Sequence, residues 1–90
     1  MNEDDVLDVL RRLDAAGLAW WIDGGWGVDA LLGEETRPHD DLDLIVRRED
    51  LDRARALLPE FVRVEDDWWP ARYVLRDASG RQIDFHPVTF

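Results

Sequence analysis

Segment 41–46 most limits how this chain can fold, because acidic and apolar residues alternate along it before it becomes wholly apolar. Successive side chains of a strand point to opposite faces. Leu42 and Leu44 would therefore enter a core, while Asp41 and Asp43 would share the other face with Cα atoms about 7 Å apart. The pattern predicts a strand that carries two like charges opposite a core, which is unusual for a purely structural strand.

A third aspartate lies in a second apolar segment near the end of the chain. Asp84 is flanked by Ile83 and Phe85, so it would face away from the core together with His86. If this strand lies beside segment 41–46, three carboxylates converge. Their oxygens suit Mg²⁺ or Mn²⁺, and a divalent cation would offset their mutual repulsion. The alternative is that these acids are solvated at strand ends and bind nothing.

Length and composition limit the number of domains and the available chemistry. The chain has 90 residues, of which 46% are hydrophobic, and it has no cysteine. A chain of this size buries only roughly 60% of the surface that it exposes when unfolded, so we predict a single domain over residues 1–90. The absence of cysteine excludes disulfides, thiolate zinc sites and a thiol nucleophile.

The charge balance bears on the partners of the chain. With 11 Lys+Arg and 21 Asp+Glu the net charge is −10, which disfavours a nucleic-acid partner. The first residues lack a basic region followed by an apolar run, and no stretch is long enough to cross a bilayer. We therefore expect a soluble, cytoplasmic protein without a membrane partner.

Hydrophobic spacing and turn residues predict an alternation of helices and strands followed by a hairpin. The expected elements are a helix from residue 3 that ends near Gly17, a buried strand at 18–22, a short helix at 26–32, a strand at 41–46, a helix at 49–58, a strand at 61–65, and a hairpin of 73–76 and 82–88. This order is typical of an α/β (α+β) domain with a small mixed β-sheet flanked by helices.

The glycine pair Gly24-Gly25 follows the first predicted strand and would open the short helix at 26–32. Backbone N–H groups at the start of a helix can bind a phosphate chain. Three acids beside such a turn can hold two metal ions. The combination predicts phosphoryl or nucleotidyl transfer.

Residues 21–33 (WIDGGWGVDALLG) and 36–44 (TRPHDDLDL) resemble the antibiotic nucleotidyltransferases. The similarity is to the lincosamide and aminoglycoside-2″-adenylyltransferase group of the polymerase-β-like superfamily. It is dense over residues 20–46 and resumes at 83–87. It implies a minimal nucleotidyltransferase fold that moves a nucleoside monophosphate from a nucleoside triphosphate, ATP, to a hydroxyl of an aminoglycoside or lincosamide, with release of pyrophosphate.

The resemblance also implies roles for individual residues. Gly24 and Gly25 would bind the triphosphate, although the superfamily usually has a serine at the second position. Asp41 and Asp43 would bind Mg²⁺. Asp84 would be the third carboxylate, close enough to the metals to be a ligand and to the acceptor hydroxyl to be its general base. The expected cofactors are two Mg²⁺ ions and ATP.

Several other residues have a functional and a structural interpretation. His39 is in phase with the aspartate pair and could contact a phosphate, or it could make a local hydrogen bond. Arg37 could bind the triphosphate or pair with a neighbouring acid in an exposed loop. His86 could act near the acceptor, or be a partly buried residue of an edge strand. Trp68-Trp69 could stack on an acceptor, or pack in an interface or against further structure.

Three alternatives remain open from the sequence. Residues 25–30 fit the G-x-G-x-x-A pattern of dinucleotide-binding folds, but the acids precede the apolar part of the next strand, and the intervening helix is short for a crossover. Family members continue past the third aspartate with structure that builds much of the acceptor pocket, so we expect that part to be missing. The chain could then be a non-catalytic module, such as an antitoxin-like partner, or a homodimer could complete the pocket.

Overall fold

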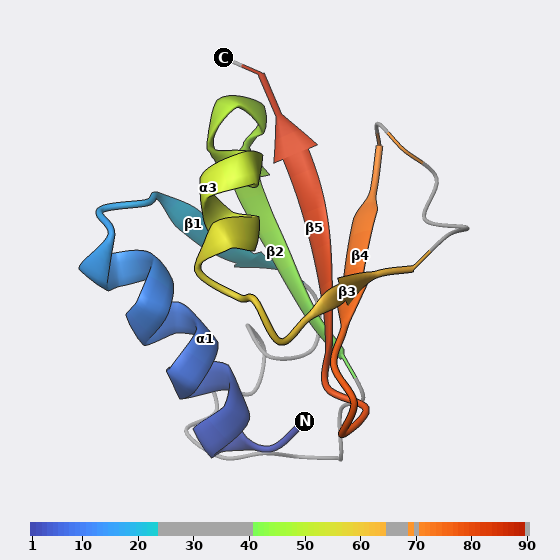
Figure 1. The fold of residues 1–90 in the computed structure, drawn as a ribbon. Coiled ribbons are helices and arrows are strands. Elements are labelled where there is room, and N and C mark those ends of the chain that lie inside the picture. Colours follow the sequence, from blue (N-terminus) through green and yellow to red (C-terminus); the bar gives the residue numbers. More distant parts are fainter. Residues whose placement is uncertain (24–40, 65–68, 70, 90) are drawn as a thin grey trace.

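The computed structural model describes residues 1–23, 41–64, 69 and 71–89, without the side chain of Asp23. Its centre is one five-stranded sheet in the order β1-β2-β5-β4-β3. Two helices, α1 and α3, contribute to the hydrophobic core on one face of this sheet (Figure 1). The strands are β1 (Trp20–Asp23), β2 (Asp41–Arg47), β3 (Val62–Arg63), β4 (Tyr73–Arg76) and β5 (Gln82–Val88). The predicted mixed sheet flanked by helices is confirmed.

Helix α1 (Glu3–Ala15) begins and ends where its sequence indicates. Asn2 and Asp5 form a capping box, each accepting a hydrogen bond from the backbone N–H of the other at 2.9 Å. Three acids occupy the first turn, where they interact favourably with the helix dipole. Gly17 follows the helix with a φ of 73°, a conformation that glycine adopts without strain. The buried face of α1 consists of Val6, Val9, Leu10 and Leu13.

The second described helix is shorter than expected. The prediction was a helix at 49–58, whereas α3 spans Leu51–Ala56 and is preceded by the 3₁₀ turn η1 (Arg48–Asp50). Leu51 and Ala54 are buried as the spacing predicts, and Leu58 is buried beyond the end of the helix. The apolar spacing thus located the inward face correctly but not the ends, which are the least certain feature of such patterns. The short helix expected at 26–32 lies outside the described residues.

Two strand predictions need correction. The expected buried strand at 18–22 is β1, which lies at one end of the sheet's strand order and leaves Trp21 45% exposed. An apolar run does not distinguish an edge strand from a central one, because alternate side chains of an edge strand can still cover the core. Of the strand expected at 61–65, the described residues 61–64 contain only the two residues of β3.

The hairpin of β4 and β5 has the predicted bounds. In its turn the Asp77 carboxylate accepts hydrogen bonds from the backbone N–H groups of Ser79 and Arg81, and Gly80 has a φ of 91°. Asp and Gly stabilise such turns for these reasons.

None of the described helices has both the length and the apolar character that crossing a membrane would require.

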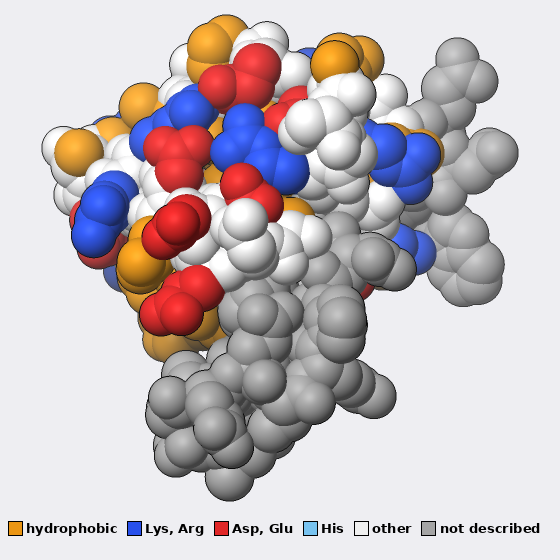
Figure 2. All heavy atoms as spheres, turned by 90° about the horizontal axis from the view of Figure 1, so that it is seen from below, with side chains coloured by type: hydrophobic (Ala, Val, Ile, Leu, Met, Phe, Trp, Pro, Cys, Tyr) orange, Lys and Arg blue, Asp and Glu red, His pale blue; other side chains and the backbone are white. Residues whose placement is uncertain are grey.

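A network of charged residues connects α1 to the rest of the domain. Arg12 donates hydrogen bonds to Asp8 and Glu60, and Arg81 donates to Asp77 and Asp8. Acidic and basic side chains are interspersed in the same way on the end of the molecule shown in Figure 2. The network ties α1 to the hairpin turn and to the segment after α3, so these residues support the fold.

Strands β2 and β5 lie next to each other at the centre of the sheet and run parallel. Leu42 and Leu44 of β2 and Ile83 and Phe85 of β5 are fully buried on the helix-covered face. The intervening residues of both strands therefore lie on the opposite face, and this pairing brings the acidic residues together.

Candidate active site

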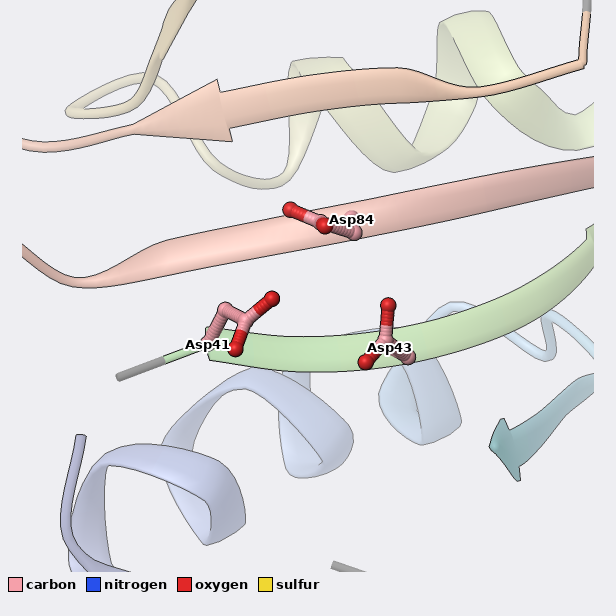
Figure 3. A group of neighbouring side chains, drawn as sticks. All are labelled: Asp41, Asp43 and Asp84. Carbon is pink, nitrogen blue, oxygen red and sulfur yellow. The ribbon is translucent and has the colours of Figure 1, made fainter. Parts of the chain in front are cut away.

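Three aspartates meet on the face of the sheet opposite the helices. Asp41, Asp43 and Asp84 each contribute a carboxylate oxygen to a group in which these atoms all lie within 4.8 Å of one another (Figure 3). Asp84 is buried and the other two are half-buried. The structure thus brings together the three acids that the sequence analysis singled out.

The strand register explains this arrangement. Asp43 is paired with Asp84 across the β2–β5 ladder, so their side chains emerge side by side on one face. Asp41 precedes Asp43 by two residues and therefore points to the same face. Because Leu42, Leu44, Ile83 and Phe85 hold the opposite face in the core, a slip of one residue in either strand would bury the acids and expose apolar groups.

Asp84 has hydrogen-bond partners for both of its oxygens. Nε and Nη2 of Arg72 donate to Oδ2 at 3.1 and 2.6 Å. Nε2 of Gln82 donates to Oδ1 at 2.8 Å. A buried carboxylate is costly unless it is paired and hydrogen-bonded, so these contacts allow Asp84 to occupy a buried position.

His86 lies beside the aspartates. Its Nε2 is 3.1 Å from Oδ1 of Asp43. The edge-strand interpretation of His86 is wrong, because β5 lies between β2 and β4. A strand's position within a sheet depends on its partners, which the alternation of its own residues does not specify. His86 is placed to orient the carboxylate of Asp43.

The electrostatics of the group favour a bound cation. The pKa of Asp41 is raised above its ordinary value by burial and by the negative charges of Asp84 and Asp43, while the charge of Arg72 acts in the opposite direction. Close carboxylates that disfavour one another's charge are stabilised by a positive ion between them. The oxygen-only donor set and its density fit a hard divalent cation such as Mg²⁺.

Four predicted nucleotide-binding residues, Gly24, Gly25, Arg37 and His39, lie outside the described residues, as does Trp68, and their roles stay predictions. Trp69 contacts the edge of the Tyr73 ring, with ring centroids 5.6 Å apart. Tyr73 belongs to the hydrophobic core. This contact favours the structural interpretation of Trp69.

Sequence reasoning missed two residues of the site, Arg72 and Gln82. Gln82 could have been found, because it precedes Asp84 by two residues and must share its face. Arg72 gives no such local signal, because it lies just before β4 and reaches Asp84 only through the pairing of β4 with β5. Identifying it requires knowledge of that pairing.

Comparison with known proteins identifies the family. A sequence model of the aminoglycoside-2″-adenylyltransferases matches residues 5–90. The chain belongs to the aminoglycoside-2″-adenylyltransferase family. This membership confirms the resemblance seen in the sequence. It also rules out the dinucleotide-binding alternative, which the antiparallel pairing of β1 with β2 independently contradicts.

Curated relatives of this family include a lincosamide resistance protein of Staphylococcus haemolyticus, 28% identical over 89 residues, which are 98% of this chain and 55% of that protein. A 2″-aminoglycoside nucleotidyltransferase of Klebsiella pneumoniae is 49% identical over 39 residues, which are 43% of this chain and 22% of that protein. The match to the Staphylococcus haemolyticus protein, which includes nearly the whole chain, thus spans about half of that relative's length.

Solved structures of the family confirm the nucleotidyltransferase fold. The lincomycin-bound crystal structure of the lincosamide antibiotic adenylyltransferase LnuA matches with a TM-score of 0.89 and 27% identity, over 99% of this chain and 57% of that one. The crystal structure of ANT(2″)-Ia in complex with adenylyl-2″-tobramycin matches with a TM-score of 0.81 and 28% identity, over 94% of this chain and 48% of that one.

Proposed function

We propose that this chain carries the nucleotide- and metal-binding part of an antibiotic nucleotidyltransferase. The reaction is Mg²⁺-dependent transfer of a nucleoside monophosphate from ATP to a hydroxyl of an aminoglycoside or lincosamide. The observation that carries the proposal is the meeting of three carboxylates on neighbouring strands in a member of this family. The ligands named for the related structures, lincomycin and adenylyl-2″-tobramycin, support the acceptor class.

Each residue of the site has a part in this proposal. Asp41, Asp43 and Asp84 would hold two Mg²⁺ ions, which would supply positive charge to the reacting phosphate and to the pyrophosphate leaving group. His86 orients Asp43 through the contact at 3.1 Å. Asp84 takes the proton of the acceptor hydroxyl on a carboxylate oxygen. Gly24 and Gly25 bind the triphosphate through their backbone, with Arg37 and His39 as further contacts.

The acceptor pocket is part of the same proposal. Because the chain covers only about half of its relatives, we assign most of the pocket to elements that match the remainder of those proteins, or to a second copy of this chain. Light scattering on the purified protein tests the homodimer. A cytoplasmic location, where ATP is available to the enzyme, belongs to the proposal too.

The decisive experiment measures pyrophosphate release. The chain is incubated with Mg²⁺, each nucleoside triphosphate and a panel of aminoglycosides and lincosamides. We expect release with at least one pair, and a loss of about 100-fold or more in Asp84→Asn, because a general base contributes that much. Asp52→Asn, an exposed position on α3, is the control for an equal change of charge.

A second measurement tests ligand binding apart from turnover. Mg²⁺ with ATP should raise the melting temperature of the wild type but not of Asp43→Asn, since a ligand that binds the folded state stabilises it. The non-catalytic alternative predicts no pyrophosphate, no nucleotide-dependent shift, and co-elution with a stable partner. That combination of results would refute the proposed function.

A further inference from the structure

Arg72 is the partner of Asp84 that the reaction proposed above does not use. Its Nε and Nη2 both donate to the same oxygen, Oδ2. The two side chains differ in accessibility, because that of Arg72 is 40% exposed and that of Asp84 is 4% exposed. A positive group that is open to solvent thus covers one oxygen of a buried acid.

The other oxygen of Asp84 is held differently. Gln82 donates to Oδ1, and the Oε1 atom of Gln82 in turn accepts a hydrogen bond from Nε of Arg76 at 3.1 Å. Val74 is the β4 residue paired with Asp84, and Arg72 and Arg76 lie two residues to either side of it. Strand β4 and the residue before it therefore place one arginine, Arg72, on Asp84 itself and the other, Arg76, behind the glutamine that supports it.

These contacts use both oxygens of Asp84. Oδ1 accepts one bond from Gln82, whereas Oδ2 accepts two from Arg72, so a cation can bind Oδ2 only if Arg72 moves. Gln82 is half-buried on β5 and is fixed from behind by Arg76, whereas the guanidinium of Arg72 has solvent to move into. Arg72 is therefore the partner that a divalent cation can displace, because both are cations that compensate the same negative charge.

We propose that Arg72 is an internal counter-ion of Asp84 that exchanges with a divalent cation when the site is occupied. Before the exchange it neutralises and orients the buried carboxylate, and during the exchange it gives up Oδ2 while Gln82 keeps Oδ1 in place. Arg72 is thus a positioning residue. The inference rests on the proposed function, since it assumes that the three aspartates bind a metal.

If Arg72 exchanges with a cation, its removal should change the cation affinity of the site in a way that the removal of a purely structural ion-pair partner would not. Removal of a structural partner leaves a buried charge unpaired and destabilises the protein. Removal of a competing partner has that effect too, but it also makes the site bind cations more tightly, because the cation no longer has to displace an arginine. Cation affinity therefore separates the two roles.

The test titrates Mn²⁺, with free Mn²⁺ followed by electron paramagnetic resonance, into wild type, Arg72→Ala and Arg72→Gln without nucleotide. Arg11→Ala is the matched control, because Arg11 is exposed on α1 and its loss changes the net charge equally. We expect Arg72→Ala to bind Mn²⁺ at least about 5-fold more tightly than the control, the lower end of typical coupling between competing ligands. Mn²⁺ should also raise its melting temperature more than that of the wild type.

Each result decides the question. If wild type binds Mn²⁺, Asp43→Asn weakens that binding, and both Arg72 variants bind as the control does or more weakly, the exchange is refuted while the metal site stands. If no form binds Mn²⁺, the metal site itself fails, and the exchange with it. Arg72→Gln loses the charge but keeps a hydrogen-bond donor, so it gives the answer if Arg72→Ala does not fold.

Discussion

Two charged clusters of this domain, both with more acids than arginines, differ in how their acids are paired. In the network at the end of α1, two arginines, Arg12 and Arg81, bond to the acids around them. On the opposite face of the sheet, three aspartates lie together, and Arg72 is bonded to one of them, Asp84. Each acid of the first cluster accepts a hydrogen bond from an arginine, whereas among the described contacts of the second cluster only Asp84 does.

The pKa values follow this difference. The hydrogen bond from Arg12 lowers the pKa of Asp8, and although burial acts against it, the hydrogen bonds of Arg81 and Ser79 lower the pKa of Asp77 to about 2. The pKa of Asp41 is raised instead, by burial and by its acidic neighbours. The fold thus favours Asp8 and Asp77 as anions and disfavours Asp41 as one, which is the pattern expected where function opposes stability.

The largest expected effect comes from Asp41→Asn. Transfer activity should fall at least about 100-fold, because a metal ion contributes several kcal/mol to the stability of such a transition state. Without divalent cations, the free energy of unfolding should stay the same or rise by up to about 1 kcal/mol, since one repulsive charge is removed. Pyrophosphate release and urea unfolding in EDTA measure the two quantities. A clear loss of stability would mean that the aspartate group is structural.

Asp77 should behave in the opposite way. Its folded pKa of about 2 lies below the ordinary 3.8, so its stabilising effect is complete above about pH 4 and is lost as the pH falls toward 2. Its side chain is only 6% exposed, and the shift corresponds to about 2 kcal/mol. Asp77→Asn should therefore lower the unfolding free energy at pH 7 by about that amount and remove this part of the acid dependence. Urea unfolding from pH 7 to pH 2 tests this, and an unchanged acid dependence would contradict it.

The smallest of these effects is expected for His86→Ala. The substitution removes the contact with Asp43 but no carboxylate, so activity should fall about tenfold, as is typical for residues that orient a metal ligand. The loss should shrink at high Mg²⁺ concentration, because the carboxylates remain available to bind the ion. A loss of 100-fold or more that Mg²⁺ does not relieve would place His86 among the groups that contact the substrate.

The sequence predicted those features of the fold that depend on residues close together in the chain. The alternation in β2 and β5 located the inward apolar residues and the outward aspartates, and the Asp and Gly residues of the turn located the hairpin. The prediction of the aspartate group assumed that β2 and β5 are neighbours. No local pattern shows which strands of a sheet pair with each other. For the same reason the edge position of β1, the contact of Arg72 with Asp84 and that of His86 with Asp43 were not predicted.

The strand order has a consequence for how the domain is made on the ribosome. Among the described strands, β5 is the last to be synthesised, yet it lies between β2 and β4. Until it emerges, the nascent chain contains two strand pairs with unpaired edges and an incomplete core, a state that is prone to aggregation. When β5 pairs with β2 and β4, it joins the two strand pairs into one sheet and brings Asp84 beside Asp41 and Asp43. A nascent chain therefore cannot form the complete aspartate group before these five strands have assembled.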